Sequence, residues 1–356
     1  MAQTKRQSNF ELLRIIAMLM VIALHYLTKG EVALKLSADG SLSNHAFNLL
    51  RDLAMVAVNV YVLISGYFLV ESSWRVGKIV YLVCQVLFYS ILTPLAVIGI
   101  STLCGGDLSW SGLSLSDKLS IFLPIEYEHY WFATAYVGMY IFAPVLAQGV
   151  KRLSQKELGL VIVAALVYFA LPKSLNPYEI PTDDYGYGYG WFMVLFLIAA
   201  YIRLYGIRLF DSAKKGFLWY LGGVLVTFAI KAAYGYMARN YGHFEYSMDM
   251  TNAYNYLGVL FSSVALFCAF VHVELKDNAA SRLVCTIAPL TFGVYLLHEN
   301  VILRLKWPFY LGVDKVTGFW GQLLHMLASV LIVFTVGIII DYIRKKIFDL
   351  FTRKNK

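Results

Sequence analysis

The stretch that decides the fold is NFELLRIIAMLMVIALHYLTKG, residues 9–30. Its apolar run is long enough to cross a bilayer, which takes about 20 residues. Arg14 lies near one end of this run and His25 near the other. The two residues are eleven positions apart, which amounts to three helical turns with a residual rotation of about 20° and a rise of roughly 16 Å. We therefore predict that both side chains lie on one face of a membrane helix, Arg14 near the cytoplasmic side and His25 near the outer side.

The whole chain has the composition of a polytopic membrane protein. Of its 356 residues, 59% are hydrophobic and 15% are charged. A soluble domain has roughly 25% charged residues. No soluble domain or low-complexity linker interrupts the apolar segments. The first segment contains Arg14 and is not followed by a small-residue cleavage site, so we interpret it as a retained helix rather than a signal peptide.

Hydropathy predicts an all-α fold with about ten transmembrane helices in a single membrane domain, residues 1–356. The predicted spans are 10–28, 49–70, 76–100, 131–150, 157–172, 189–206, 217–237, 254–274, 284–304 and 320–343. Inner segments, including both chain ends, hold roughly 19 Lys and Arg residues against about 8 outside, which places both termini in the cytoplasm. The net charge of +8 is thus explained by topology. We expect the lipid bilayer as a partner and no nucleic acid, and we predict no oligomeric state.

Ionisable side chains inside a membrane span are costly and by default indicate a functional site. Taken alone, Arg14 could be a side chain that snorkels to the inner interface, and His25 an interfacial residue at a helix end. Their shared face favours function, because a cation low on the helix and an imidazole high on it suit a long anionic ligand from the cytoplasm. Other polar residues are predicted near the depth of His25, with Asn59 nearer the middle of its span: Arg51, Asp52, Asn59, Glu128, His129, His298, Glu299 and Asn300.

These residue types suit general acid–base catalysis. A histidine beside a carboxylate is the usual general base, because the carboxylate fixes the tautomer of the imidazole. Zinc is the rival interpretation of His25, His129 and His298. These histidines come from separate spans without ligand spacing, and none of the four cysteines has metal-ligand spacing. We therefore predict no metal site.

The predicted outer segments are rich in tyrosine and carboxylates. The run YGYGYGW, residues 185–191, is the most concentrated example. Aromatic faces can stack on pyranose rings, and carboxylates accept protons from sugar hydroxyls, so this surface could bind sugars. The alternative is that these rings form the aromatic belt found at membrane interfaces.

Several short elements, taken together, resemble the acyltransferase 3 family of membrane proteins, which O-acylate surface polysaccharides and have a ten-helix membrane domain. In chain order they are a basic residue, ten residues and a histidine (Arg14 to His25), Ser65-Gly66-Tyr67, Trp131-Phe132 with Pro144 further on, LFLIAAYIRLYG (residues 195–206), and Tyr295-Leu-Leu-His298. The resemblance runs over nearly the whole chain and implies the family's fold and an O-acyltransferase activity.

The chain departs from the family pattern after the second span. Many members have Arg-x-x-Arg there, whereas this chain has Arg75 and Lys78. Lysine keeps the charge but cannot bind a phosphate in the bidentate way that arginine does. We expect no esterase-like domain after the last span, so the chain looks closest to the stand-alone members. Those members acetylate capsule, exopolysaccharide or common-antigen sugars in the bacterial cytoplasmic membrane.

The resemblance implies acetyl-CoA as the acyl donor, no permanently bound cofactor, and a polysaccharide or lipid-linked sugar as acceptor. Residues and resemblance together predict three groups of site residues. The catalytic group is His25, Arg14, His298, Glu128 and His129; the group that binds the donor is Arg14, Arg75, Lys78, Ser65 and Tyr67; and the group that binds the acceptor is Asp52, Asn59, Trp131, Tyr295 and Glu299.

Two other functions suit a polytopic protein with buried polar residues. One is a transporter or flippase of lipid-linked sugars, and the other is a sensor or scaffold without turnover. Transporter folds often show internal repeats and helices broken at matching positions. The sequence shows neither, so we favour the acyltransferase.

Overall fold

The computed structural model describes residues 7–106, 108–176, 178 and 184–353. Every regular element in these ranges is a helix, and the chain divides into two compact units. Unit 1 comprises Met1–Trp74 and Ala135–Cys285, and unit 2 comprises Arg75–Thr134 and Thr286–Lys356. The all-α prediction is confirmed. Four terminal residues predicted to lie inside are outside the described ranges: Lys5, Arg6, Lys354 and Lys356.

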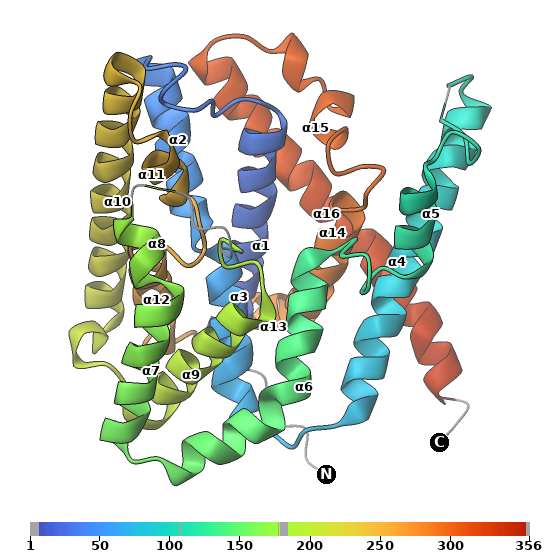
Figure 1. Cartoon of the computed structure of the whole chain (residues 1–356). Helices are drawn as coiled ribbons and strands as arrows, with labels where there is room; N and C mark the ends of the chain where they lie inside the picture. The colour runs from blue at the N-terminus through green and yellow to red at the C-terminus, as the bar shows by residue number, and fades with distance from the viewer. Residues whose placement is uncertain (1–6, 107, 177, 179–183, 354–356) are drawn as a thin grey trace. The chain divides into compact units, whose positions relative to one another are not determined.

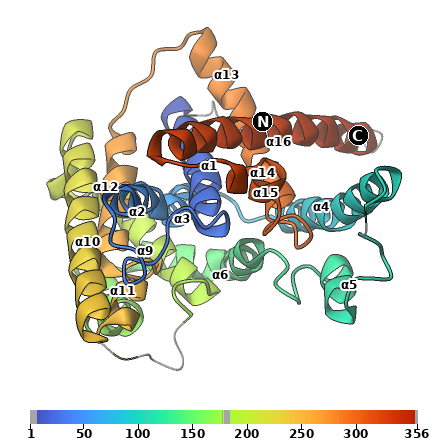
Figure 2. The ribbon, with the colours of Figure 1, turned by 90° about the horizontal axis from the view of Figure 1, so that it is seen from above.

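Unit 1 is built from helices that pack pairwise along their lengths. Figure 2 shows α10 beside α12, and α3 packs on α9 and α1. Its elements are α1 (Ser8–Lys29), α2 (Leu42–Met55), α3 (Ala57–Leu69), α7 (Gln155–Phe169), α8 (Leu171–Leu175), α9 (Tyr189–Tyr205), η1 (Arg208–Phe210), α10 (Ala213–Tyr241), α11 (Glu245–Met250) and α12 (Leu257–Val271). Two helices continue from one unit into the other: α6 (Trp131–Arg152) and α13 (Ala279–Ile287).

Gly66 permits the close packing of α3 on α9. A Cβ atom at this position would lie 3.0 Å from the Cα of Phe196 and 3.0 Å from the Cβ of Ala199. A larger residue would push the two helices apart, because packed interiors leave no spare volume. Gly66 is the centre of the Ser-Gly-Tyr element and Ala199 belongs to residues 195–206. Two sequence elements that suggested the family therefore meet at one helix contact.

Unit 2 contains two long helices and several short ones. Figure 1 shows α5 beside α4. Its elements are α4 (Val76–Leu103), α5 (Leu115–Phe122), η2 (Ala288–Leu290), α14 (Thr291–His298), α15 (Trp307–Tyr310), η3 (Val313–Lys315) and α16 (Phe319–Arg353).

Asp341 anchors α16 to α4 inside unit 2. Its side chain is 0% exposed and accepts hydrogen bonds from the Tyr89 hydroxyl at 2.9 Å and the Gln85 Nε2 at 3.1 Å. The Arg344 Nε donates to the same carboxylate at 2.6 Å. A Cβ atom at Gly293 of α14 would come within 2.2 Å of the Asp341 Oδ1. Only glycine leaves room for this buried charge pair between the helices.

The polytopic membrane fold is supported by the lengths and compositions of the helices. Seven helices of the described residues are long and apolar enough to cross a membrane, and α9 and α12 are shorter apolar helices. The total of ten spans and the cytoplasmic location of both termini stay predictions.

The second span begins earlier than hydropathy predicted, at Leu42 rather than residue 49. The Ser41 side chain caps the helix by accepting a hydrogen bond from the Asn44 N–H at 3.2 Å. The first turns of α2 are polar, so a hydropathy window misses them. Arg51 and Asp52 consequently lie inside a helix and not at its outer end.

Two later helix ends also differ from the prediction. The ninth predicted span continues to residue 304, whereas α14 ends at His298, so Glu299 and Asn300 follow the helix. The last helix, α16, continues to Arg353 instead of ending at residue 343. Its charged final turns lower the hydropathy without breaking the backbone hydrogen bonds of a helix, which do not depend on apolar side chains.

Candidate active site

Arg14 and His25 are both half-buried and lie on the uninterrupted helix α1. The Arg14 Nη1 donates to the Glu11 Oε1 at 2.9 Å, and Glu11 is itself buried. The guanidinium is therefore held by a carboxylate one turn away on its own helix. A side chain that merely snorkels to water would not need a buried partner.

Helices α3 and α6 complete the surroundings of Arg14 in unit 1. The Tyr61 hydroxyl donates to the Arg14 carbonyl oxygen at 2.7 Å, and the Ser65 hydroxyl donates to the Tyr61 carbonyl oxygen at 3.0 Å. Tyr136 of α6 lies near both Ser65 and Arg14. The structure thus brings together Arg14 and Ser65, two of the residues predicted to bind the donor.

Tyr67 contacts a cation that the sequence analysis did not single out. The Arg203 guanidinium lies 4.8 Å from the centre of the Tyr67 ring, and its Nη1 donates to the Tyr67 hydroxyl at 3.2 Å. Arg203 also forms an ion pair with Glu71, whose Oε2 lies 2.9 Å from the Arg203 Nε. Arg203 belongs to residues 195–206, so the family element was the available signal.

A cavity of about 170 Å³ lies between the segment after α3 and helix α6. Its lining includes Ser72, Trp74, Gln148 and Lys151. The Trp74 Nε1 donates to the Tyr140 carbonyl oxygen at 3.0 Å, which fixes the indole beside the cavity. The cavity offers an aromatic ring and a lysine, and sequence reasoning missed it because its two walls are far apart in the chain.

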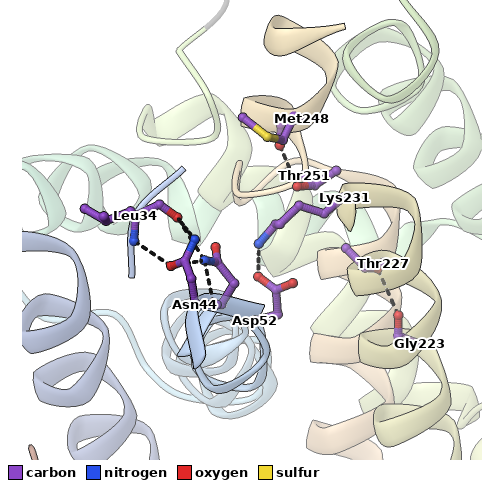
Figure 3. Close-up of polar contacts among 9 residues, drawn as sticks. Leu34, Asn44, Asp52, Gly223, Thr227, Lys231, Met248 and Thr251 are labelled. Carbon is purple, nitrogen blue, oxygen red and sulfur yellow. Dashed lines mark hydrogen bonds and ion pairs between the residues drawn. The ribbon is translucent and has the colours of Figure 1, made fainter. Parts of the chain in front are cut away.

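Asp52 forms a buried ion pair with Lys231, which joins α2 to α10 inside unit 1. Figure 3 shows Lys231 reaching toward Asp52 near Thr227 and Thr251, with the second Asp52 oxygen turned away from the ammonium group. Lys231 is 1% exposed, and that second oxygen has no hydrogen-bond partner in the described part of the chain. This pairing gives Asp52 a structural task, and its predicted contact with an acceptor stays a prediction.

Asn59 joins three segments of unit 1 and is 0% exposed. Its Nδ2 donates to the Tyr254 carbonyl oxygen at 2.9 Å and to the Ser263 hydroxyl at 3.3 Å. Its Oδ1 accepts from the Trp191 Nε1 at 3.1 Å. Trp191 ends the glycine- and tyrosine-rich run and is buried, whereas Tyr187 of the same run is exposed. Asn59 and Trp191 thus hold three segments of unit 1 together. The exposed tyrosines of the run are still candidates for the predicted sugar-binding surface, which stays a hypothesis.

His298 of unit 2 is held in one tautomer. Its Nδ1 lies 2.6 Å from the Val294 carbonyl oxygen, so Nδ1 carries a proton and donates it to this hydrogen bond. The imidazole is 3% exposed and lies edge-on between two rings, Tyr295 at 6.3 Å and Trp307 at 6.1 Å between centroids. Glu299, also buried, follows directly. An imidazole with a fixed orientation suits proton transfer.

His129 makes different hydrogen bonds from those of His298. Its Nε2 accepts from the Val301 N–H at 3.1 Å, so its Nδ1 carries the proton and donates to the Ser120 carbonyl oxygen at 3.1 Å. Both ring nitrogens are therefore bonded to backbone groups, and the ring joins helix α5 to the segment that follows α14. Burial lowers the pKa of His129 to about 4. A positioning role fits this geometry better than catalysis.

The other predicted residues of unit 2 lie in more open places. Glu128 is exposed, with a left-handed φ of 47°. Trp131 begins α6, and its ring contacts Phe132 at 5.9 Å between centroids. Arg75 and Lys78 are exposed at the start of α4. The convergence of His25 of unit 1 with the unit 2 residues stays a prediction.

A comparison with protein families now bears on this site. A family model described as an acyltransferase domain matches residues 7–342. The chain belongs to the acyltransferase 3 family. The match includes both units and every predicted site residue, and it makes the protein a membrane acyltransferase. No curated protein and no solved structure gives a significant match.

The buried ion pair predicts a strongly non-additive pair of substitutions. Asp52→Leu or Lys231→Met alone leaves one buried charge unpaired and should lower the free energy of unfolding by about 3–5 kcal/mol. The double variant removes both charges and should recover most of that loss. Denaturant unfolding in detergent measures all three values. Lys35→Met is the matched control, because the Lys35 pair with Asp249 is exposed and worth at most about 1 kcal/mol. Additive losses in the double variant would contradict the pairing.

The two hydrogen bonds of the buried His129 ring predict a specific pH dependence of stability. The folded pKa of about 4 lies below the value of about 6.5 in an unfolded chain, so acid protonates the unfolded state first. The stabilisation is complete above pH 6.5 and is lost as the pH falls toward 4. The stability difference between wild type and His129→Gln should therefore shrink by about 3 kcal/mol over that interval. A difference that does not change with pH would show that the imidazole is not buried in its neutral form.

Proposed function

We propose that this protein transfers an acetyl group from cytoplasmic acetyl-CoA to a sugar hydroxyl of a cell-surface or lipid-linked polysaccharide, in the bacterial cytoplasmic membrane. The observation that carries the proposal is helix α1, which holds Arg14 and His25 on one continuous helix. Their spacing gives a rise of roughly 16 Å along one face. That separation suits a donor that is held by its charged end and presents its thioester near the far side.

Arg14 is the centre of the donor site in this proposal. The Glu11 carboxylate fixes its guanidinium. Tyr61 links the Arg14 backbone to Ser65, because it donates to the Arg14 carbonyl oxygen and accepts from the Ser65 hydroxyl. Charge-assisted hydrogen bonds to phosphate are about twice as strong as neutral ones, so a cation held in place is well suited to the CoA phosphates. Arg203 lies over Tyr67, another residue predicted to contact the donor.

Further groups support binding of the donor's nucleotide end. The exposed cations Arg75 and Lys78 suit phosphates that arrive from the aqueous phase. The cavity beside Trp74 presents an aromatic ring for a base, with Lys151 in its lining. Aromatic stacking is a common way to hold such a base.

The chemistry is acyl transfer from a thioester. His25 acts as general base on the acceptor hydroxyl, whose oxygen forms a bond to the acetyl carbon while the C–S bond breaks. The proton taken by His25 passes to the leaving thiolate of CoA, so charges and atoms balance. In an alternative order of steps, the acetyl group is first transferred to His25 and then to the acceptor hydroxyl. His298 and Glu299 orient the reacting groups from unit 2.

The acceptor contacts in this proposal rest on Trp131, Tyr295, Glu299 and the exposed Glu128. Asp52 and Asn59, which we also predicted to touch the acceptor, are already bonded to Lys231 and to three neighbouring groups, respectively. We assign these two, and His129, to the positioning of the fold.

Replacement of His25 tests the proposed base. His25→Ala should lower the transfer of labelled acetyl from acetyl-CoA to membrane glycan by at least about 100-fold while the protein folds normally. CoA release and labelled glycan are measured with the purified full chain in nanodiscs that also contain the native glycan. His243→Ala, an exposed histidine, is the matched control and should retain full turnover. Undiminished transfer by His25→Ala would exclude this base, and glycan transport without CoA release would favour a flippase.

Replacement of Arg14 tests the donor site. Arg14→Ala removes a charged hydrogen-bond donor and should raise the KM for acetyl-CoA by roughly 10- to 100-fold, with a smaller change in kcat. Arg282→Ala is the matched control, because the Arg282 side chain is 71% exposed, and its KM should not change. A change in protein yield alone, at constant KM, would show that Arg14 only anchors the helix at the membrane interface.

A further inference from the structure

Arg51 of α2 is a cation of unit 1 that its own fold leaves without a partner. The side chain is half-buried, and its Nε atom is buried with no hydrogen-bond partner among the described residues. The guanidinium also forms no ion pair in the part of the chain that the structure describes. A charge inside a membrane helix is costly, and by default it indicates a functional site.

Three other arginines of the helices are at least partly buried and have carboxylate partners. These pairs are Arg14 with Glu11, Arg203 with Glu71, and Arg344 with Asp341. A buried charge without its partner destabilises a fold, and native proteins retain few unpaired buried groups without a reason. Arg51 departs from this pattern, which indicates that its counter-ion comes from outside the chain.

The carboxylates around Arg51 are already bound to other cations. Asp52 and Asp249 interact electrostatically with Arg51. Asp52 pairs with Lys231, and neighbouring residues on a helix do not face each other, so Asp52 turns away from Arg51. Asp249 lies 2.7 Å from the Lys35 Nζ. Because Lys231 also interacts electrostatically with Arg51, two cations share the one buried carboxylate of Asp52.

An exposed aromatic ring of the same unit belongs to the surroundings of Arg51. Tyr187 of the glycine- and tyrosine-rich run interacts electrostatically with Arg51 and is 45% exposed. Gly186 fixes the run in place: its φ is 81°, and a Cβ atom there would lie 2.8 Å from the Asn255 nitrogen. The Tyr187 ring contacts the Tyr254 ring at 5.2 Å between centroids. A fixed turn thus presents an accessible ring beside the cation.

A hydrogen-bond acceptor without a partner completes the region. The Asn252 Oδ1 is buried and has no hydrogen-bond partner among the described residues. Asn252 belongs to the turn that follows α11, where its N–H donates to the Asp249 carbonyl oxygen at 3.0 Å. An amide oxygen can accept a hydrogen bond from a sugar hydroxyl. The region therefore offers a cation, a ring and an acceptor from three segments of unit 1.

We propose that Arg51 is a specificity-determining residue that binds an anionic substituent, a carboxylate or a phosphate, of the acceptor glycan. This inference rests on the proposed function and names its substrate class, an acidic glycan. The guanidinium donates to the anionic group, the sugar ring stacks on Tyr187, and a sugar hydroxyl donates to the Asn252 Oδ1. All three contacts, and the base His25, belong to unit 1.

A guanidinium discriminates strongly between an acidic and a neutral sugar. Its fork of N–H donors matches the two oxygens of a carboxylate or phosphate. A neutral sugar would leave the cation unpaired, so it lacks the gain that an anion brings. Helix α2 packs on α1, which carries His25, so a sugar held at Arg51 lies beside the helix of the proposed base. We therefore expect Arg51 to determine acceptor binding and to leave acetyl-CoA binding unchanged.

Two sugars that differ at one group test the proposal without any turnover. Methyl glucuronide has a carboxylate where methyl glucoside has a hydroxymethyl group. The full chain in phosphatidylcholine nanodiscs, which contain no anionic lipid, should bind the glucuronide about 10- to 100-fold more tightly, the effect of a charge-assisted hydrogen bond. Ligand-observed NMR titration measures both Kd values. Glucose 6-phosphate, titrated in the same way, distinguishes a phosphate from a carboxylate as the preferred anion.

Replacement of Arg51 should remove the preference and keep the fold. In Arg51→Gln the Kd values of the acidic and neutral sugars should agree within about two-fold. Its thermal unfolding temperature without sugar should be unchanged or higher, because the variant lacks an unpaired buried charge. Arg51→Lys keeps the charge without the fork and should keep part of the preference. Arg239→Gln is the matched control, because Arg239 is an exposed arginine in the last turn of α10, and it should keep all of it.

Three results would overturn the inference. The first is a wild type that binds neither acidic sugar more tightly than the neutral one. The second is a preference that survives Arg51→Gln, and the third is a variant that loses preference and thermal stability together, which would make Arg51 a structural residue. In the first case, an unfolding temperature that phosphatidylglycerol raises in the wild type but not in Arg51→Gln would assign Arg51 to a lipid headgroup instead.

The outcomes also separate this inference from the function on which it rests. A wild type that prefers the acidic sugar through Arg51 but releases no CoA from acetyl-CoA, with native glycan present, contradicts the proposed function alone. In an active enzyme, Arg51→Gln should raise the KM for the glycan by at least about 10-fold and change the KM for acetyl-CoA by less than about two-fold. An unchanged KM for the glycan contradicts the role of Arg51 alone.

Discussion

Charges buried among apolar helices need partners of opposite sign, and this requirement organises each unit separately. Water does not reach such groups, so an unpaired one is far more costly than on a surface. Lys231 meets Asp52 in unit 1, and Arg344 meets Asp341 in unit 2. The Lys231–Asp52 pair fixes the face that α10 turns toward α2, because the two partners must touch. In unit 2 the hydrogen bonds from Tyr89 and Gln85 to Asp341 fix the face that α16 turns toward α4. The buried Asp341 carboxylate also constrains α14, which has a glycine, Gly293, where it passes this carboxylate.

Sequence alone predicts charge pairs that are close along a helix and fails for distant ones. Glu11 and Arg14 are three residues apart, so a helix over residues 9–30 already places them together. Lys231 and Asp52 are 179 residues apart, and hydropathy does not say which polar group a buried lysine meets. The start of α2 was missed for a related reason. Its polar side chains lower the hydropathy, although Ser41 caps the helix and Asn44 bonds to backbone groups that would otherwise lack partners.

The site was predictable as a set of residue types and not as a set of roles. His129 and His298 look equivalent in the sequence, each beside a glutamate and at similar predicted depth. The structure separates them by their nitrogens. His129 bonds to backbone groups of two other segments, whereas the Nδ1 of His298 donates to the Val294 carbonyl oxygen of its own helix. Which hydrogen bonds a ring makes depends on how loops pass it, and no local pattern encodes that.

Hydrogen-bond satisfaction therefore identifies the residues that hold this protein together. Asn59 makes three hydrogen bonds, which is what a buried amide needs if it is only to support the fold. His129 is satisfied in the same way, because both of its ring nitrogens bond to backbone groups. Asn59 and His129 belong to residue types that binding and catalysis also use, so residue type alone does not separate the two tasks. The number of hydrogen bonds that a buried side chain already makes to its own fold does separate them, because each such bond occupies a donor or an acceptor that a substrate would need.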